Sequence, residues 1–270
     1  MWTEELAERA KADTDRRKQV YSKEIKKSIE NSTISYYENT SDVKPKWNNM
    51  CVRIEQEGSV ETLIDVVDTN SGKKVAVLNF ASFKNPGGAY ISGAMAQEEA
   101  LCHASTLYNI ISDAKFVNGF YEPNKSLLNK GRYTDRHIYV KDVLFEYKAQ
   151  VIYPVDVITC AAPNKSYAFN ANDAALAKEI DTVMFKRIDQ ILYSAYRNDV
   201  DILILGAFGC GVFKNNPNVV AKAFNDLLQS KYQGAFKEVV FAIPPGRKQR
   251  DFKSVADKNL VAFIQNIKAQ

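Results

Sequence analysis

A short apolar run followed by a long glycine-rich loop constrains the fold more than any other part of the chain. Residues 75–80 (VAVLNF) predict a buried strand, because the run is short, apolar and contains β-branched residues. The pattern stops at residues 85–88 (NPGG), where the fixed φ of proline and the freedom of glycine predict an irregular loop. Residues 97–99 (QEE) then open a helical pattern that continues to residue 111.

A strand, a glycine-rich loop and a helix start are typical of a site for an anionic ligand. Glycine lets backbone N–H groups approach a phosphate closely, and the helix dipole adds partial positive charge. Glu98 and Glu99, at the far end of this loop, add acid–base capacity beside such a ligand. A purely structural interpretation stays open, because glutamates are favoured in a first helical turn and Pro-Gly-Gly loops often only connect elements.

A second glycine-rich loop follows another apolar run. Residues 201–205 predict a buried strand, and residues 206–211 (GAFGCG) come directly after it. Short apolar strands alternating with helices predict an α/β fold with a largely parallel sheet that is covered on both faces. Ligands bind such sheets beyond the carboxyl ends of the strands, so both loops are expected at the same edge.

The rest of the chain fits the same fold class. Residues 3–31 predict one or two helices, residues 32–49 a polar connector and residues 117–136 a polar surface segment. We expect a helical extension over residues 1–49, packed on a domain over residues 50–270. Further strands are predicted at 50–55, 137–140, 143–145, 153–160 and 237–243, and further helices at 59–66, 172–196, 217–228 and 254–267.

Composition limits the possible functions. A net charge of +4 over 270 residues suits an acidic ligand but lacks the basic stripe of a dedicated nucleic-acid binder. The four cysteines are scattered and there are two histidines, so we expect reduced thiols, no metal site and no cofactor. No apolar run is long enough to span a membrane and no secretion signal is present, so a cytoplasmic protein is expected.

At the two loops the sequence resembles a known family. The run GGA at 87–89, seven residues and then QEE at 97–99 resembles the signature of poly(ADP-ribose) glycohydrolases, usually GGG followed by QEE. The surrounding text, VLNFAS and KNPGG, is similar to the bacterial-type branch, and LGAFGCGVF at 205–213 resembles the second phosphate loop of the family. The resemblance covers roughly residues 50–245. It implies a macrodomain-like three-layer α/β/α fold with a mostly parallel mixed sheet and an N-terminal helical extension.

The resemblance also implies roles for individual residues. Glu99 would be the general acid that later activates water, and Glu98 would orient ribose hydroxyls. Phe213 would lie beside the distal ribose, although an anchor for the loop is the structural alternative. Asn79 would fix the loop or touch the ligand, or only bond to backbone at the strand end. The remaining substrate-binding residues would be Gly87, Gly88, Ala89, Gln97, Gly209, Cys210, Gly211 and Val212.

The implied reaction is cleavage of the ribose–ribose O-glycosidic bonds of poly(ADP-ribose), through an oxocarbenium-like transition state. The expected partners are ADP-ribose, its polymer and ADP-ribosylated macromolecules. Two alternatives remain open: hydrolysis of mono-ADP-ribose from protein or nucleic acid, and a catalytically weak ADP-ribose-binding module. The second depends on Ala89, whose methyl group is harmless at negative φ and costly at positive φ.

Overall fold

The structure, a computed structural model, describes residues 3–36, 40, 42–147, 150–151, 154–245 and 255–268. Its strands are β1 (Thr33–Ser35), β2 (Cys51–Glu55), β3 (Val75–Phe80), β4 (His137–Val143), β5 (Glu146–Tyr147), β6 (Gln150–Val151), β7 (Val155–Cys160), β8 (Ile202–Leu205) and β9 (Glu238–Ala242). In this part of the chain the main sheet has the order β1-β4-β7-β3-β8-β9-β2, and β5 pairs with β6 separately. Strands β7, β3, β8, β9 and β2 run parallel, whereas β4 is antiparallel to both of its neighbours.

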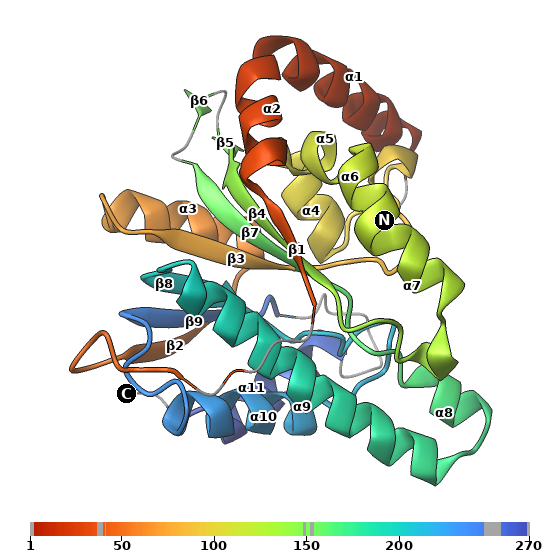
Figure 1. Cartoon of the computed structure of the whole chain (residues 1–270), viewed down its shortest axis with the longest axis vertical. Coiled ribbons are helices and arrows are strands. Elements are labelled where there is room, and N and C mark those ends of the chain that lie inside the picture. The colour runs from red at the N-terminus through yellow and green to blue at the C-terminus, as the bar shows by residue number, and fades with distance from the viewer. Residues whose placement is uncertain are drawn as a thin grey trace.

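Helices cover both faces of this sheet (Figure 1). The helices are α1 (Glu4–Val20), α2 (Ser22–Asn31), α3 (Ser59–Thr69), α4 (Gln97–His103), α5 (Leu107–Ile111), α6 (Ala114–Phe116), α7 (Glu122–Ser126), α8 (Ser166–Asn170), α9 (Ala174–Arg197), α10 (Pro217–Gln229) and α11 (Val255–Asn266). Shorter helical turns are η1 (Tyr90–Ser92), η2 (Val117–Tyr121, a π-helix) and η3 (Asn129–Gly131). The predicted α/β class and mostly parallel sheet are confirmed.

The apolar run of β3 is explained by burial on both faces. Ala76 and Leu78 pack into the core formed with α9, α10 and α11, while Val75 and Val77 pack into the core formed with α3, α4 and α5. Side chains alternate across a strand, so a strand between two helical layers needs apolar residues at nearly every position.

The two glycine loops leave the same edge of the sheet, as predicted. Strands β3 and β8 are neighbours and parallel, with Val77 opposite Ile204. Strand β7 lies on the other side of β3 and is parallel to it, so residues 161–164 also leave from this edge.

Three local predictions were wrong. The connector 32–49 contains β1, which pairs antiparallel with β4. The helix predicted to run to residue 111 is divided into α4 and α5, because the backbone turns away and Thr106 donates its N–H to Leu144 O at 2.9 Å. Segment 117–136 is only partly a surface segment, because Phe120 and Tyr121 are fully buried. The predicted starts of elements at residues 153 and 254 lie outside the described residues, and the domain boundary at residue 49 stays a prediction.

Candidate active site

The first glycine loop turns sharply after β3 and leads into α4. Gly87 and Gly88 have φ of 65° and 61°, in the left-handed region that other residues avoid. Ala89 has φ −113° and ψ 27°, which an alanine adopts without backbone strain. The methyl group that departs from the GGG pattern is therefore tolerated in this loop.

Glu99 is fixed by backbone groups from two segments. Its Oε1 accepts a hydrogen bond from Ala89 N at 2.9 Å, and its Oε2 accepts one from Ala96 N at 3.1 Å. Ala96 is the residue before the first turn of α4, so the second bond also caps the helix. The fit is close, because a Cβ atom on Gly88 would lie 2.5 Å from Glu99 Oε1. The side chain is buried, and the loop and the helix start together set its direction.

Glu98 points toward the end of β3 instead. Its Oε2 accepts a hydrogen bond from Ser82 N at 2.7 Å, and its Oε1 accepts one from Asn79 Nδ2 at 3.2 Å. Consecutive helical residues differ in direction by about 100°, which separates the two carboxylates. Burial raises the pKa of Glu98 to about 8, although the hydrogen bonds from Ser82 and Asn79 oppose the shift. The Glu98 carboxyl therefore keeps its proton to a higher pH than an ordinary glutamate does.

Gln97 joins α4 to the strand. Its Oε1 accepts a hydrogen bond from Phe80 N at 2.9 Å, and its Nε2 donates to Leu78 O at 2.8 Å. The same Nε2 donates to Ser59 Oγ at 3.1 Å, at the start of α3. The side chain thus continues the hydrogen bonding of β3 beyond the sheet and fixes the first turn of α4.

The second loop holds a buried thiol inside a tight turn. Gly209 has φ 71°, and a Cβ atom there would lie 2.5 Å from Ala162 Cβ. Burial raises the pKa of Cys210 to about 12, so its thiol does not ionise at neutral pH and is no nucleophile. Val212 is 88% exposed, and a Cβ on Gly211 would meet no atom of the described chain within 4 Å. This part of the loop is open to a ligand.

Phe213 links the two loops through aromatic contacts. Its ring centroid lies 6.5 Å from that of Phe83 in the first loop and 6.2 Å from that of Tyr133. Phe83 and Tyr133 stack on each other at 4.2 Å. The sequence analysis assigns no role to Phe83 or Tyr133. The one sequence feature that points to Phe83 is its position four residues before Gly87.

The remaining sequence predictions concern a catalytic cysteine, metal binding and membrane-spanning helices. Cys102 and His103 form no thiolate–imidazole pair: Cys102 is buried with its pKa raised well above the ordinary value, and the His103 ring packs edge-on against Tyr90. Among the residues that the structure describes, no three His, Cys, Asp or Glu side chains are grouped to hold a metal ion. In the same ranges, no helix has the length and apolar character needed to span a membrane.

Comparisons with known proteins identify a family for the chain. Residues 3–146 match the family model described as microbial-type PARG, catalytic domain, where PARG stands for poly(ADP-ribose) glycohydrolase. The structure is similar to the crystal structure of poly(ADP-ribose) glycohydrolase from Deinococcus radiodurans in complex with ADP-ribose, with 29% identity, a TM-score of 0.76 and coverage of 90% of this chain and 96% of that chain.

Two structures of the Thermomonospora curvata enzyme are also similar. One shares 25% identity at a TM-score of 0.84 and covers 98% of this chain and 100% of that chain. The other, bound to the inhibitor ADP-HPD, shares 26% identity at a TM-score of 0.81 and covers 97% of this chain and 99% of that chain. A search of curated proteins found no match.

Proposed function

The chain belongs to the family of microbial-type poly(ADP-ribose) glycohydrolase catalytic domains, and from this premise we propose that it cleaves ribose–ribose O-glycosidic bonds of poly(ADP-ribose) with Glu99 as general acid and base. The observation that carries the proposal is the double backbone anchoring of Glu99 at the end of the glycine loop. A general acid must be held in one direction, because proton transfer needs hydrogen-bond distance to the leaving oxygen.

The two glycine loops are proposed to hold the pyrophosphate of the terminal ADP-ribose. Gly87, Gly88 and Ala89 let the chain approach the pyrophosphate closely from one side, with Gly88 N and Ala89 N already donating to Asn85 O and Glu99 Oε1, and residues 209–212 approach it from the other. Adjacent parallel strands bring both loops to one edge of the sheet, and the exposed position of Val212 leaves room there. The Deinococcus radiodurans relative, crystallised with ADP-ribose, supports this ligand.

Aromatic and polar side chains are proposed to enclose the distal ribose. Phe213, braced by Phe83 and Tyr133, offers an apolar wall to the sugar. Burial raises the pKa of Glu98 and so favours its protonated form, which is able to donate a hydrogen bond to a ribose hydroxyl as well as accept one. Asn79 and Gln97 are proposed to support the site without touching the sugar, because the Asn79 side chain bonds to Glu98 and the Gln97 side chain bonds to the end of β3.

In the proposed reaction Glu99 gives its proton to the oxygen of the leaving ribose. The bond between that oxygen and the anomeric carbon of the distal ribose breaks, and positive charge develops on the distal sugar. The resulting Glu99 carboxylate then takes a proton from water, whose oxygen bonds to the anomeric carbon. The products are free ADP-ribose and a polymer that is shorter by one unit, and Glu99 ends protonated as it began.

The test is a Glu99→Gln variant assayed for release of ADP-ribose from poly(ADP-ribose). Loss of a general acid typically lowers turnover by about 10²- to 10⁴-fold, while the loops still bind ADP-ribose. Glu61→Gln is the matched control, because Glu61 also lies in the first turn of a helix but is exposed. Turnover by Glu99→Gln at the rate of Glu61→Gln would remove Glu99 from the mechanism.

The same assay distinguishes the two alternatives. A mono-ADP-ribosyl hydrolase would release ADP-ribose from a mono-modified protein and leave the polymer intact, and a binding module would bind both without release. A catalytically weakened protein would require backbone strain at Ala89, and a φ of −113° imposes none.

A further inference from the structure

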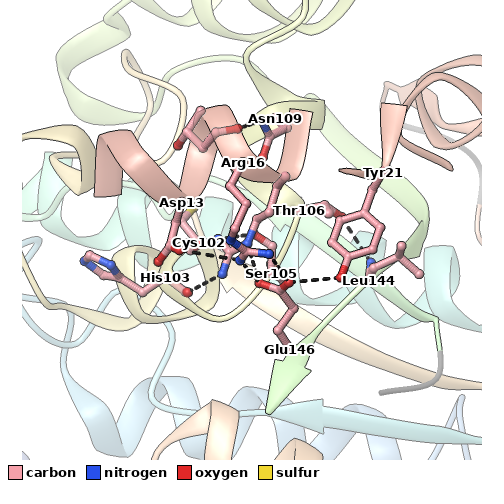
Figure 2. Close-up of polar contacts among 12 residues, drawn as sticks. Asp13, Arg16, Tyr21, Cys102, His103, Ser105, Thr106, Asn109, Leu144 and Glu146 are labelled. Atoms are coloured by element: carbon pink, nitrogen blue, oxygen red, sulfur yellow. Dashed lines mark hydrogen bonds and ion pairs between the residues drawn. The ribbon is translucent and has the colours of Figure 1, made fainter. Parts of the chain in front are cut away.

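Arg17, in the last turn of α1, is a buried charged residue outside the proposed reaction. It is 2% exposed and lies far in sequence from both glycine loops. Its guanidinium donates to three backbone carbonyls: Nη1 to Cys102 O at 2.9 Å and to Ser105 O at 2.8 Å, and Nη2 to His103 O at 2.7 Å. Figure 2 shows these three residues and Glu146 gathered beneath α1.

These carbonyls lie at and just beyond the end of α4. The last carbonyls of a helix have no partner within the helix and carry its partial negative charge. A planar guanidinium can donate to several of them at once, which a single ammonium group cannot do in the same geometry. Arg17 therefore caps the C-terminus of the helix whose first turn carries Glu98 and Glu99.

Helix α4 depends on contacts at its ends. It has seven residues, and a helix of this length is not stable by itself in water. Gln97 fixes the first turn to β3, and Arg17 fixes the last turn to α1. The end of α4 is also held by Glu146 N, which donates to Ala104 O at 2.7 Å, so Arg17 acts together with the segment that carries Glu146 in setting the direction of the helix that carries Glu99.

Helix α1 also packs on the glycine loop. Tyr90 Oη, one residue after Ala89, donates to Ala10 O at 3.0 Å. Gly93 has φ 81°, and a Cβ atom there would lie 2.9 Å from Ala7 N, so the loop lies directly against the helix. Helix α1 thus contacts both the glycine loop, whose Ala89 N holds Glu99 Oε1, and the C-terminal end of α4.

Glu146 completes the cluster from β5. Its Oε2 accepts from Arg17 Nε at 2.7 Å and from Arg16 Nη2 at 2.6 Å, and its Oε1 accepts from Tyr21 Oη at 3.1 Å. Burial by itself would raise the pKa of Glu146, but the hydrogen bonds from Arg16 and Arg17 outweigh it and lower the pKa to about 2. The carboxylate is charged at neutral pH and holds the guanidinium against the carbonyls.

We propose that Arg17 is a positioning residue for catalysis: by tying the end of α4 to α1, it fixes the direction in which Glu99 meets the glycosidic bond. The inference depends on the proposed role of Glu99. It predicts an effect on kcat rather than on binding, because the glycine loops that are proposed to bind the pyrophosphate receive no hydrogen bond from Arg17.

The experiment compares Arg17→Met with Arg16→Met, using release of ADP-ribose from poly(ADP-ribose) and direct binding of ADP-ribose. Arg16 is the matched control, because it lies next to Arg17 and pairs with the same Glu146, but it is 45% exposed and its hydrogen bonds go to Glu146 and Asp13. A displacement of about 1 Å at a catalytic group costs on the order of 10²-fold in rate. We expect kcat of Arg17→Met to fall by about this factor with little change in affinity for ADP-ribose, and Arg16→Met to stay near wild type.

Two further variants distinguish loss of folding from a displacement of Glu99. Arg17→Lys keeps the charge beside Glu146 but not the planar donors, so kcat should still fall well below that of Arg16→Met. Arg17→Ala leaves space for a guanidinium ion, and millimolar guanidinium should restore part of its kcat where ammonium at the same ionic strength does not. Circular dichroism at the assay temperature verifies that each variant is folded.

The results of these assays distinguish failure of the positioning role of Arg17 from failure of the proposed function. If folded Arg17→Met and Arg17→Lys turn over like Arg16→Met, or if guanidinium and ammonium act alike on Arg17→Ala, the positioning role is overturned. If Glu99→Gln keeps its activity, the proposed function fails first, whatever the Arg17 variants do. A drop in kcat for both Arg17 variants, with Glu99→Gln inactive and Arg16→Met active, supports the inference.

Discussion

Gly88 lies where the first glycine loop meets the two glutamates, and replacing it by alanine tests how closely the loop controls Glu99. Its φ of 61° is unfavourable for alanine, and the added Cβ would lie 2.5 Å from Glu99 Oε1 and 3.1 Å from Glu98 Oε2. One added methyl group thus causes two effects, an unfavourable φ and a steric clash with the glutamates, so a control is needed that has the unfavourable φ alone. Gly72 provides it: its φ is 77°, and a Cβ there would meet no atom of the described chain within 4 Å.

The two variants are expected to differ both in the free energy of unfolding and in turnover rate. An L-residue in the left-handed region costs about 1–2 kcal/mol in the free energy of unfolding, which applies to Gly72→Ala and Gly88→Ala alike. In Gly88→Ala the Glu99 carboxylate must also move by roughly 1 Å, and losing its bond from Ala89 N adds about 1–3 kcal/mol. A shift of this size at the general acid lowers kcat by about 10²-fold.

The assay is release of ADP-ribose from poly(ADP-ribose) by both variants, with urea unfolding to measure stability. Gly88→Ala should be the less stable of the two and should lose turnover, whereas Gly72→Ala should lose stability alone. If folded Gly88→Ala turns over as fast as Gly72→Ala, then either the loop does not set the direction of Glu99 or Glu99 is not the acid.

Two further predictions concern ligand contact and pH. Gly211→Ala should leave stability within about 0.5 kcal/mol of wild type, because the site is open; calorimetry should nonetheless show weaker ADP-ribose binding, and unchanged affinity would mean that no phosphate lies against Gly211. The folded pKa of Glu98, about 8, lies above the ordinary value of 4.5, so between these pH values the folded protein holds a proton that the unfolded chain has lost. The free energy of unfolding should therefore fall as pH rises through this window, by up to about 1.4 kcal/mol per pH unit. Urea unfolding of Glu98→Gln should show a flatter dependence on pH. An equally steep dependence in the variant would assign the titration to another group.

Much of the fold and the position of the two glycine loops could be predicted from local sequence. The run 75–80 is apolar at almost every position because β3 is buried on both faces, and that pattern is visible without a structure. The position of both loops at one edge follows from parallel strands, which the alternation of strands and helices already predicts. The motif 97–99 lies at a helix start as expected, since glutamate favours the first turn.

What local sequence could not predict depends on contacts between distant segments. Strand β1 has three residues, too few for a visible alternation, and its pairing with β4 connects residues about a hundred positions apart. The division between α4 and α5 follows from the contact of residues 105–106 with residues 144–145, not from a glycine or a proline. The sequence predicts a polar surface segment around Tyr133, because the composition of that segment does not reveal that the Tyr133 ring stacks on Phe83.

The buried charges of Arg17 and Glu146 are best explained by position rather than by stability. Buried ion pairs contribute little net stability, because desolvation offsets their attraction, and well-packed apolar residues often serve as well. An apolar residue in place of Arg17 would fill its volume but would leave the carbonyls of Cys102, His103 and Ser105 without this donor. The end of α4 would then lose its connection to α1, while the first turn stayed fixed to β3 by Gln97. The end of α4 would then be held by the hydrogen bond from Glu146 N to Ala104 O and by the contact of Ser105 with Phe145, without the three bonds from the guanidinium, and a shift at that end would be transmitted along the seven-residue helix that carries Glu99. A fall in kcat for the Arg17 variants would therefore make α1 part of the catalytic unit, with the buried arginine supporting the end of a helix of only seven residues.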